Sequence, residues 1–232
     1  MKFGVLYLIP LPIHPTDEFQ PNLTPPIIKE HISKLNHFAV ENIRTARRYI
    51  KKIEPNFNID NTFFEVLNKK SNPSVTHKII GEIKNGRSYG LMSEAGCPGI
   101  ADPGKILCDI AHQQNIKIKP LIGPCSITMA LMASGLNGQN FAFHGYLPIQ
   151  QKERINEIKK LSKKIGAHIF IETPYRNEKL IKDLLLHLDG EKKLCIATNL
   201  TGFNEYINTK TVKEWKEVKF NINKQPTIFI FE

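Results

Sequence analysis

Cysteine is scarce in this sequence of 232 residues, which has only Cys97, Cys108, Cys125 and Cys195. The four are far apart, no C-x-x-C pair occurs, and no histidine stands at metal-ligand spacing. This pattern indicates neither a zinc site nor a disulfide framework, so we expect no bound metal. Sparse cysteines of this kind are typical of a protein that works in the reducing cytoplasm.

Long apolar runs are also missing. Residues 3–13 follow Lys2 in the manner of a signal peptide, but Pro10 and Pro12 interrupt them and no small-residue cleavage site follows. No segment reaches the ~18 apolar residues that a membrane-spanning helix needs, so we expect no membrane span. The apolar run at residues 5–9 instead predicts a first strand that is buried on both faces.

The usual phosphate-binding signatures are absent as well. Neither G-x-x-x-x-G-K-[ST] nor G-x-G-x-x-G occurs, which disfavours ATP and NAD as ligands. What the sequence does have is positive charge, because 32 Lys and Arg residues against 22 Asp and Glu residues give a formal net charge of +10. This excess favours an acidic partner such as RNA, although Lys-rich soluble proteins without such a partner are common.

The middle of the chain has a repeated order of elements. Residues 89–92 read as a strand that runs into a loop rich in glycine and proline (residues 93–104) and then a helix; a second strand, Gly-Pro turn and helix follow to residue 134. This order predicts parallel strands joined by crossovers, with ligands bound beyond the carboxyl ends of the strands. Residues 58–73 are polar and read as a loop, apart from the apolar Phe63, Phe64, Val66 and Leu67.

The remainder predicts a second α/β domain. Strands are expected at residues 168–172, 194–199 and 227–231, a hairpin strand at 205–208, and a helix at 177–188. We therefore predict two α/β domains, 1–144 with a mainly parallel sheet and 149–232 with a mixed sheet, separated by a cleft.

A cationic helix is expected at residues 41–53. Its apolar stripe is formed by Ile43, Ala46, Ile50 and Ile53, and its opposite face carries Arg44, Arg47, Arg48 and Lys51. Several cations on one face favour contact with a phosphate backbone, and a simple solvated face is the alternative.

Seven motifs, in order along nearly the whole chain, carry a resemblance to a known superfamily. They are Leu6-Tyr-Leu-Ile-Pro-Leu-Pro-Ile13, Val40-Glu-Asn-Ile-Arg-Thr45, Leu91-Met-Ser-Glu-Ala-Gly-Cys-Pro-Gly-Ile-Ala-Asp-Pro-Gly104, Pro120-Leu-Ile-Gly-Pro-Cys-Ser126, Ser134-Gly-Leu136, Phe143-His-Gly-Tyr-Leu-Pro148 and Ile171-Glu-Thr-Pro-Tyr-Arg176. Together they resemble the tetrapyrrole methylase superfamily of S-adenosylmethionine-dependent enzymes. The sequence is most similar to the branch that methylates a cytidine ribose 2′-oxygen in small-subunit ribosomal RNA.

The resemblance implies a two-domain α/β fold of the tetrapyrrole methylase type. It also implies a homodimer and S-adenosylmethionine bound in the cleft between the domains. Carried over by position, the implied cofactor contacts are Pro12, Ile13, Cys97, Ile100, Ser126, Ile127, Glu172 and Ala197. Ile100 and Ile127 have a plainer interpretation as core residues.

The chemistry implied is an in-line displacement that needs alignment of donor and acceptor rather than a covalent nucleophile. Glu94 and Glu41, both at predicted strand ends, are the candidate groups to take or orient the proton of an acceptor hydroxyl. Glu41 has an alternative as a helix-start residue. The candidate substrate contacts are Arg44, Arg47, Arg48 and Arg176.

Some motifs depart from the ribosomal RNA branch. Glu94 stands in place of Asp and Cys97 in place of Thr in the Ser-Asp-Ala-Gly-Thr-Pro motif, and residues 198–202 lack the two charges that open the late motif. The sequence also ends after its last predicted strand, without the branch's frequent helical extension. Two alternatives therefore stay open: a tetrapyrrole, other small-molecule or protein acceptor, and a catalytically silent RNA-binding scaffold.

Overall fold

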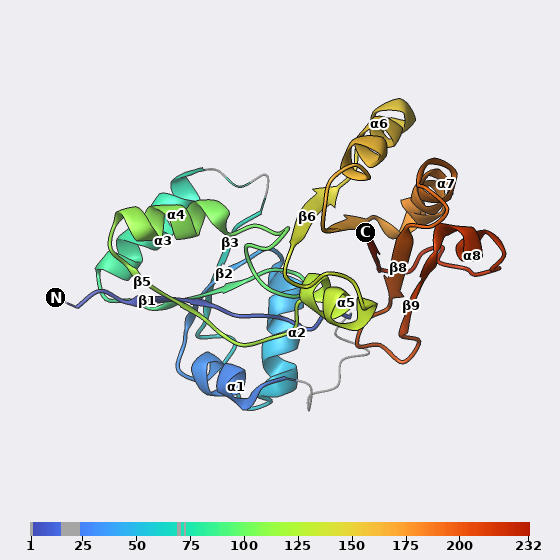
Figure 1. Ribbon diagram of the computed structural model, residues 1–232. Helices are drawn as coiled ribbons and strands as arrows, with labels where there is room; N and C mark the ends of the chain where they lie inside the picture. Colours follow the sequence, from blue (N-terminus) through green and yellow to red (C-terminus); the bar gives the residue numbers. More distant parts are fainter. Residues whose placement is uncertain (1, 15–23, 69–70, 72) are drawn as a thin grey trace. The chain divides into compact units, whose positions relative to one another are not determined.

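The computed structural model describes residues 2–14, 24–68, 71 and 73–232. The chain forms two compact units, Met1–Cys125 and Ser126–Glu232. Each unit is an α/β layer structure with its own five-stranded sheet (Figure 1). In the described ranges, no helix is long and apolar enough to cross a bilayer.

The first unit has an all-parallel sheet of order β3-β2-β4-β1-β5. Its strands are β1 (Val5–Leu8), β2 (His37–Val40), β3 (Phe63–Val66), β4 (Tyr89–Met92) and β5 (Lys117–Pro120). In the centre, Leu6 of β1 pairs with Tyr89 on one side and Ile118 on the other. Because all strands are parallel, their carboxyl ends and the loops that follow them lie along one edge of the sheet.

Helices cover both faces of this sheet. They are α1 (Pro26–Ile32), α2 (Ile43–Ile53), α3 (Pro73–Lys84) and α4 (Lys105–Gln113). Alternate residues of β2 show the two layers: Phe38 packs in one core with α1 and α2, and Ala39 packs in the other with α3 and α4. Figure 1 shows these helix pairs on opposite sides of the sheet. Burial on both faces explains why the central strands read as continuous apolar runs.

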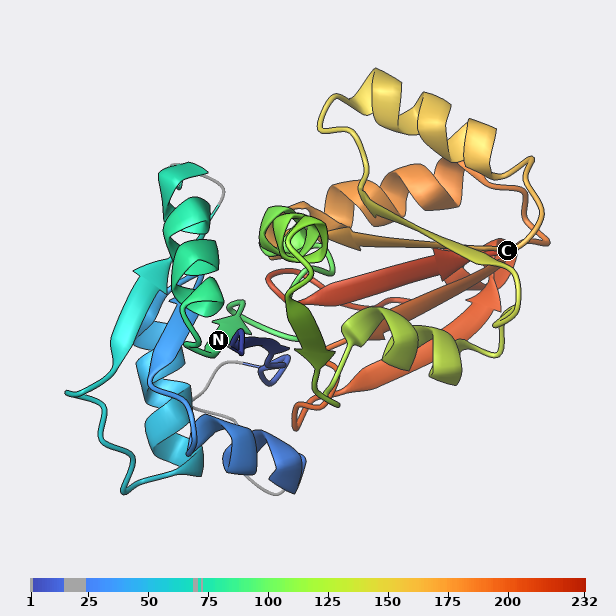
Figure 2. The same ribbon diagram turned by 90° about the vertical axis from the view of Figure 1, so that its left-hand side faces the viewer.

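The second unit has a mixed sheet of order β6-β7-β10-β8-β9 (Figure 2). Its strands are β6 (Phe141–Tyr146), β7 (Ala167–Glu172), β8 (Lys193–Thr198), β9 (Tyr206–Thr211) and β10 (Thr227–Phe231). Only β6 and β7 are parallel, while β10 runs antiparallel to both of its neighbours, β7 and β8. The last strand in sequence is therefore the central strand of the sheet.

The helices of the second unit are α5 (Ser126–Ser134), α6 (Gln151–Leu161), α7 (Asn177–His187) and α8 (Val212–Lys216), with a 3₁₀ turn at Pro174–Arg176. Helices α6, α7 and α8 share one core with the sheet, centred on Phe170, Phe229 and Trp215. Helix α5 packs on β9 and β10, and the Thr209 hydroxyl donates to the Ser134 carbonyl at 2.7 Å. Figure 2 shows α5 on the opposite side of the sheet from α6 and α7.

The predicted fold class is confirmed, with a parallel first sheet and a mixed second sheet. Two details differ. Residues 58–73, expected as a loop apart from Phe63, Phe64, Val66 and Leu67, contain the edge strand β3, and the short helix α8 was not expected. The compact units divide between Cys125 and Ser126, where α5 begins and packs on the strands of the second sheet. The domain bounds 1–144 and 149–232 stay a prediction.

Candidate functional site

Two loops meet at the carboxyl edge of the parallel sheet. Leu11, in the loop after β1, forms an antiparallel bridge with Gly96 in the glycine and proline loop after β4. The Leu11 amide donates to the Gly96 carbonyl at 2.9 Å, and the Gly96 amide returns a bond of 3.1 Å. Gly96 has a φ of 63°, a left-handed conformation that a residue without Cβ adopts at no steric cost. The bridge places Pro12 and Ile13, both half-buried, next to the Gly/Pro loop.

A third loop, after β5, joins them. A Cβ on Gly123 would lie 2.3 Å from the Pro10 Cβ, so only glycine allows these two loops to approach so closely. The Cys97 thiol of the Gly/Pro loop donates to the Pro124 carbonyl at 3.4 Å. The structure thus brings together the loops after β1, β4 and β5, which the sequence analysis had selected separately.

The Gly/Pro loop also presents accessible backbone and apolar surface. Gly99 has a φ of 81°, and a Cβ there would meet no atom within 4 Å, so the space beside it is open. The neighbouring Ile100 is 45% exposed, which excludes its alternative interpretation as a core residue. Open backbone beside exposed apolar side chains suits a ligand with both a polar and an apolar part.

The two predicted catalytic carboxylates lie together at the same edge. Glu41 follows β2 and Glu94 follows β4, and these strands are neighbours. The Glu94 amide donates to Glu41 Oε2 at 3.3 Å, and the Thr45 hydroxyl donates to Glu94 Oε1 at 3.3 Å. The Glu94 side chain is exposed, whereas Glu41 is half-buried, so Glu94 is the more accessible of the two.

A residue that was not predicted as part of the site holds the loop after β1 in place. The Tyr49 hydroxyl, on the buried face of α2, donates to the Pro10 carbonyl at 3.3 Å. Burial raises the pKa of Tyr49 to about 12, so the hydroxyl keeps its proton and remains a donor at neutral pH. The burial of Tyr49 could have been predicted, because Tyr49 stands three residues after Ala46 on the predicted apolar stripe.

The cationic face of α2 is smaller than its sequence indicates. Asn42 caps the helix by accepting bonds from the amides of Arg44 and Thr45. Arg44, Arg47 and Arg48 are exposed, and Arg47 pairs with Asp60 at 3.4 Å. Lys51 turns away to donate to the carbonyls of Pro55 and Phe57, beyond the end of the helix.

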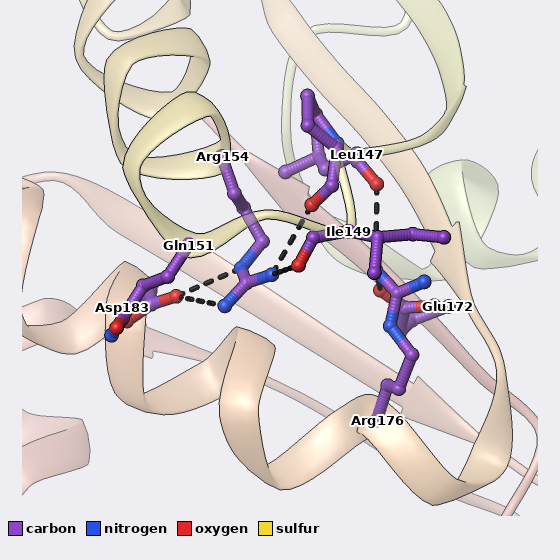
Figure 3. A network of polar contacts seen from close by, with 8 residues as sticks. Leu147, Ile149, Gln151, Arg154, Glu172, Arg176 and Asp183 are labelled. Atoms are coloured by element: carbon purple, nitrogen blue, oxygen red, sulfur yellow. Dashed lines mark hydrogen bonds and ion pairs between the residues drawn. The ribbon is translucent and has the colours of Figure 1, made fainter.

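In the second unit, the predicted cofactor residue Glu172 and substrate residue Arg176 contact each other (Figure 3). Their ion pair spans 2.8 Å, and the carboxylate also accepts the Thr173 amide at 2.7 Å. The Glu172 side chain is only 1% exposed, whereas Arg176 is 23% exposed and also reaches the Leu147 carbonyl. Arg176 therefore neutralises a buried charge as well as facing solvent.

A second, fully buried ion pair lies beside it and was not predicted. Arg154 Nη2 is 2.7 Å from Asp183 Oδ2, and both side chains are at most 5% exposed. The same guanidinium donates to the carbonyls of Pro148 and Ile149, and Gln151 donates to the other Asp183 oxygen (Figure 3). This network fastens Pro148 and Ile149, which precede α6, to helix α7.

The remaining predicted cofactor residues lie in the second unit. Ser126 begins α5 and is half-buried, Ile127 follows it and is buried, and Ala197 is fully buried in β8 between β9 and β10. Their role in binding stays a prediction. Among the residues described, no group of three or more His, Cys, Asp or Glu side chains is arranged to hold a metal ion.

Comparison with solved structures defines the class. The methyltransferase CobJ superposes with a TM-score of 0.65 over 99% of this chain and 94% of its own, at 12% identity. Uroporphyrin-III C-methyl transferase from Thermus thermophilus complexed with S-adenyl homocysteine superposes with a TM-score of 0.58 over 98% of this chain and 97% of its own, at 13% identity. The fold is that of the two-domain tetrapyrrole methyltransferases.

Sequence relatives narrow the class to a family, although no protein-family model matches the chain. Ribosomal RNA small subunit methyltransferase I of Buchnera aphidicola subsp. Schizaphis graminum is 34% identical over 206 residues, which are 89% of this chain and 69% of the relative. The protein of the same name from Buchnera aphidicola subsp. Acyrthosiphon pisum is 32% identical over 231 residues, which are 98% of this chain and 78% of the relative. The chain belongs to the ribosomal RNA small subunit methyltransferase I family. The predicted resemblance and the predicted enzyme class, a methyltransferase, are confirmed.

Proposed function

We propose that this protein transfers a methyl group from S-adenosylmethionine to the ribose 2′-oxygen of a cytidine in small-subunit ribosomal RNA. One observation carries the proposal: in a chain of this family, the loops after β1, β4 and β5 and both predicted carboxylates assemble at one edge of the parallel sheet. That edge is where open α/β sheets bind their ligands.

The residues of this edge fit the methyl donor. Pro12, Ile13 and Ile100 offer apolar surface for an adenine ring, and the open backbone at Gly99 leaves room for the polar part of the molecule. When bound, S-adenosylmethionine supplies an electrophilic methyl group on a sulfonium centre. The task of the loops is to hold donor and acceptor in line and to exclude water.

Glu94 is the proposed proton acceptor for the ribose hydroxyl. Its side chain is exposed, and the Thr45 hydroxyl holds one carboxylate oxygen in place. Glu41 is the positioning residue, because its carboxylate accepts the Glu94 amide and so fixes the start of the loop. A positioned carboxylate of this kind contributes about 10²–10⁴ in rate.

The RNA contact is proposed to include α2. Arg44 and Arg48 are exposed on α2, the helix that follows Glu41, and no ion pair to another described residue is found for either. Arginines on one helix face suit a phosphate backbone, since each neutralises one phosphate and releases counterions. Arg176 is a further proposed contact, held in place by Glu172.

The direct test supplies purified protein and labelled S-adenosylmethionine to cell extract that is then separated into RNA, protein and small-molecule fractions. We expect label in small-subunit ribosomal RNA, and mass spectrometry of its nucleosides should show 2′-O-methylcytidine. Label in the protein fraction or in the small-molecule fraction would contradict ribosomal RNA as the methyl acceptor. Calorimetric titration with S-adenosylhomocysteine tests the donor site separately, because a silent scaffold would show no binding heat.

The proposal extends to assembly and location. We propose a homodimer that works in the cytoplasm, as the resemblance and the sparse cysteines lead us to expect. Sedimentation equilibrium should give twice the chain mass of 26.5 kDa. A monomer mass at all concentrations would contradict the assembly.

A further inference from the structure

Two of the four cysteines lie side by side in the loops proposed to hold the cofactor. Cys97 is in the Gly/Pro loop after β4, and Cys125 ends the Gly-Pro-Cys turn after β5. The Cys97 sulfur is 3.4 Å from the carbonyl oxygen of Pro124, the residue directly before Cys125, and 4.0 Å from that of Gly123. Burial, and next the Cys125 thiol with which it shares a hydrogen bond, raise the pKa of Cys97.

Both cysteines are half-buried and neither forms a disulfide in this structure. Cys97 lies in a tight part of the loop, between Gly96 and Pro98, where Gly96 and Gly99 both adopt positive φ values. A disulfide needs the two sulfurs about 2 Å apart, so the two thiols, which already share a hydrogen bond, must move closer together before they can join. Cys97 stands where the resembling branch has Thr, so the pair is a feature of this chain's own sequence.

We propose that Cys97 and Cys125 are a modification site: they form a reversible disulfide that ties the β4 and β5 loops together and lowers the affinity for S-adenosylmethionine. The effect on affinity rests on the proposed function, whereas the disulfide does not. A bridge here would replace the bond from the Cys97 thiol to Pro124 and pull Cys97 away from its place beside the open Gly99 backbone.

The oxidant is a small-molecule disulfide such as oxidised glutathione. One cysteine thiolate attacks a glutathione sulfur; a protein–glutathione S–S bond forms and one glutathione thiol leaves. The second thiolate attacks the protein sulfur of that mixed bond, so the Cys97–Cys125 bond forms and a second glutathione thiol leaves. Two protein thiols and one disulfide thus give one protein disulfide and two small thiols.

The raised pKa of Cys97 sets the pH dependence. The thiolate is the nucleophile, and a raised pKa leaves Cys97 protonated at neutral pH. We expect the bond to form slowly near neutral pH and faster as the pH rises. A rate that falls as the pH rises from 7 to 9 would contradict this chemistry.

Oxidised glutathione and intact protein provide the test. Trypsin separates the cysteines, because residues 88–105 contain only Cys97, residues 106–117 only Cys108 and residues 118–152 only Cys125. We expect peptides 88–105 and 118–152 to be linked after oxidation and released by dithiothreitol. Absence of this link, with Cys108 alkylated to the same extent before and after, would overturn the site.

The effect on the cofactor is measured on the same samples. Calorimetry should show affinity for S-adenosylhomocysteine at least tenfold lower in the oxidised protein, restored by dithiothreitol. Cys125→Ser should abolish both the link and the redox difference, while Cys108→Ser, another half-buried cysteine of this unit, should keep both. Equal affinity for S-adenosylhomocysteine in the oxidised, linked protein and in the reduced protein would overturn the proposed effect on cofactor binding. No binding even by the reduced protein would instead count against the proposed function, and the peptide map would still decide the disulfide.

Discussion

The carboxylates at the end of β2 and β4 differ in what they accept. Glu94 accepts the Thr45 hydroxyl, whereas Glu41 accepts a main-chain amide. On this difference rests the proposal of separate tasks, proton transfer for Glu94 and holding the loop for Glu41; from the sequence both were candidates, and Glu41 alone had the alternative of a helix-start residue.

Glu94→Gln is expected to lower the single-turnover methylation rate by roughly 10²–10⁴, because the amide cannot accept the proton. The affinity for S-adenosylhomocysteine should stay within about threefold, since the change keeps the side-chain shape. Glu30→Gln is the matched control: Glu30 is exposed and pairs with Lys34, away from the carboxyl edge. A rate loss that is equal in both variants would argue against Glu94 as the acceptor.

Arg154 supports a prediction about stability. Arg154→Met leaves the buried Asp183 carboxylate without its charged partner and with only the Gln151 hydrogen bond, so the free energy of unfolding of the second unit should fall by about 3–5 kcal/mol. Urea unfolding can be followed by Trp215, the only tryptophan, which is buried in the same core. Lys160→Met, which removes an exposed pair with Glu157, should change the midpoint little. Equal shifts of the unfolding midpoint in Arg154→Met and Lys160→Met would show that burial of the ion pair does not set the loss of stability.

Some contacts of single residues could not be predicted from the sequence. Arg154 and Asp183 are separated by a strand and most of two helices, and no local pattern marks two charges that will be buried together. Lys51 looked like part of a cationic face because its spacing fits, yet its flexible side chain reaches the helix end instead. Tyr49, by contrast, was predictable as a buried residue but not as a donor to the Pro10 carbonyl.

At the scale of elements, strong periodicity gave reliable predictions. The long helices and the buried strands were found because their apolar patterns extend over many residues. Strand β3 was missed because four residues at a sheet edge, surrounded by polar loop sequence, carry little pattern. Helix α8 had a usable signal in its Thr211-to-Glu214 capping box, whose two hydrogen bonds are both present.

The approach of the β1 and β5 loops gives a prediction at this scale. Gly123→Ala places a Cβ 2.3 Å from the Pro10 Cβ and must push the two loops apart. We expect roughly tenfold weaker binding of S-adenosylhomocysteine and a loss of about 1–3 kcal/mol in stability. Gly81→Ala, at an open and exposed helix position, should instead stabilise by about 0.5–1 kcal/mol. Unchanged affinity in Gly123→Ala would show that the contact does not shape the binding site.

At the scale of the whole molecule, the net charge of +10 predicts salt-sensitive RNA binding. The logarithm of the affinity should fall linearly with the logarithm of KCl concentration. Arg44→Gln and Arg48→Gln should each reduce the slope by about 1, if each arginine neutralises one phosphate. Lys34→Gln removes the same charge from a side chain already paired with Glu30, and should leave the slope unchanged. Filter binding with a small-subunit RNA fragment measures the slope for all three variants. Equal slopes in the two arginine variants and in Lys34→Gln would contradict the proposed contact between α2 and RNA.

The central position of β10 affects how the protein is made. A ribosome delivers the chain from its N-terminus, so every partner strand of the first sheet has emerged once β5 leaves the exit tunnel. The second sheet must wait for residues 227–231, because β7 and β8 are held together only through β10. Until then, the hydrogen-bonding edges of β7 and β8 that pair with β10 have no partner strand. A premature stop codon before residue 227 would therefore leave a folded first unit attached to an aggregation-prone half-sheet.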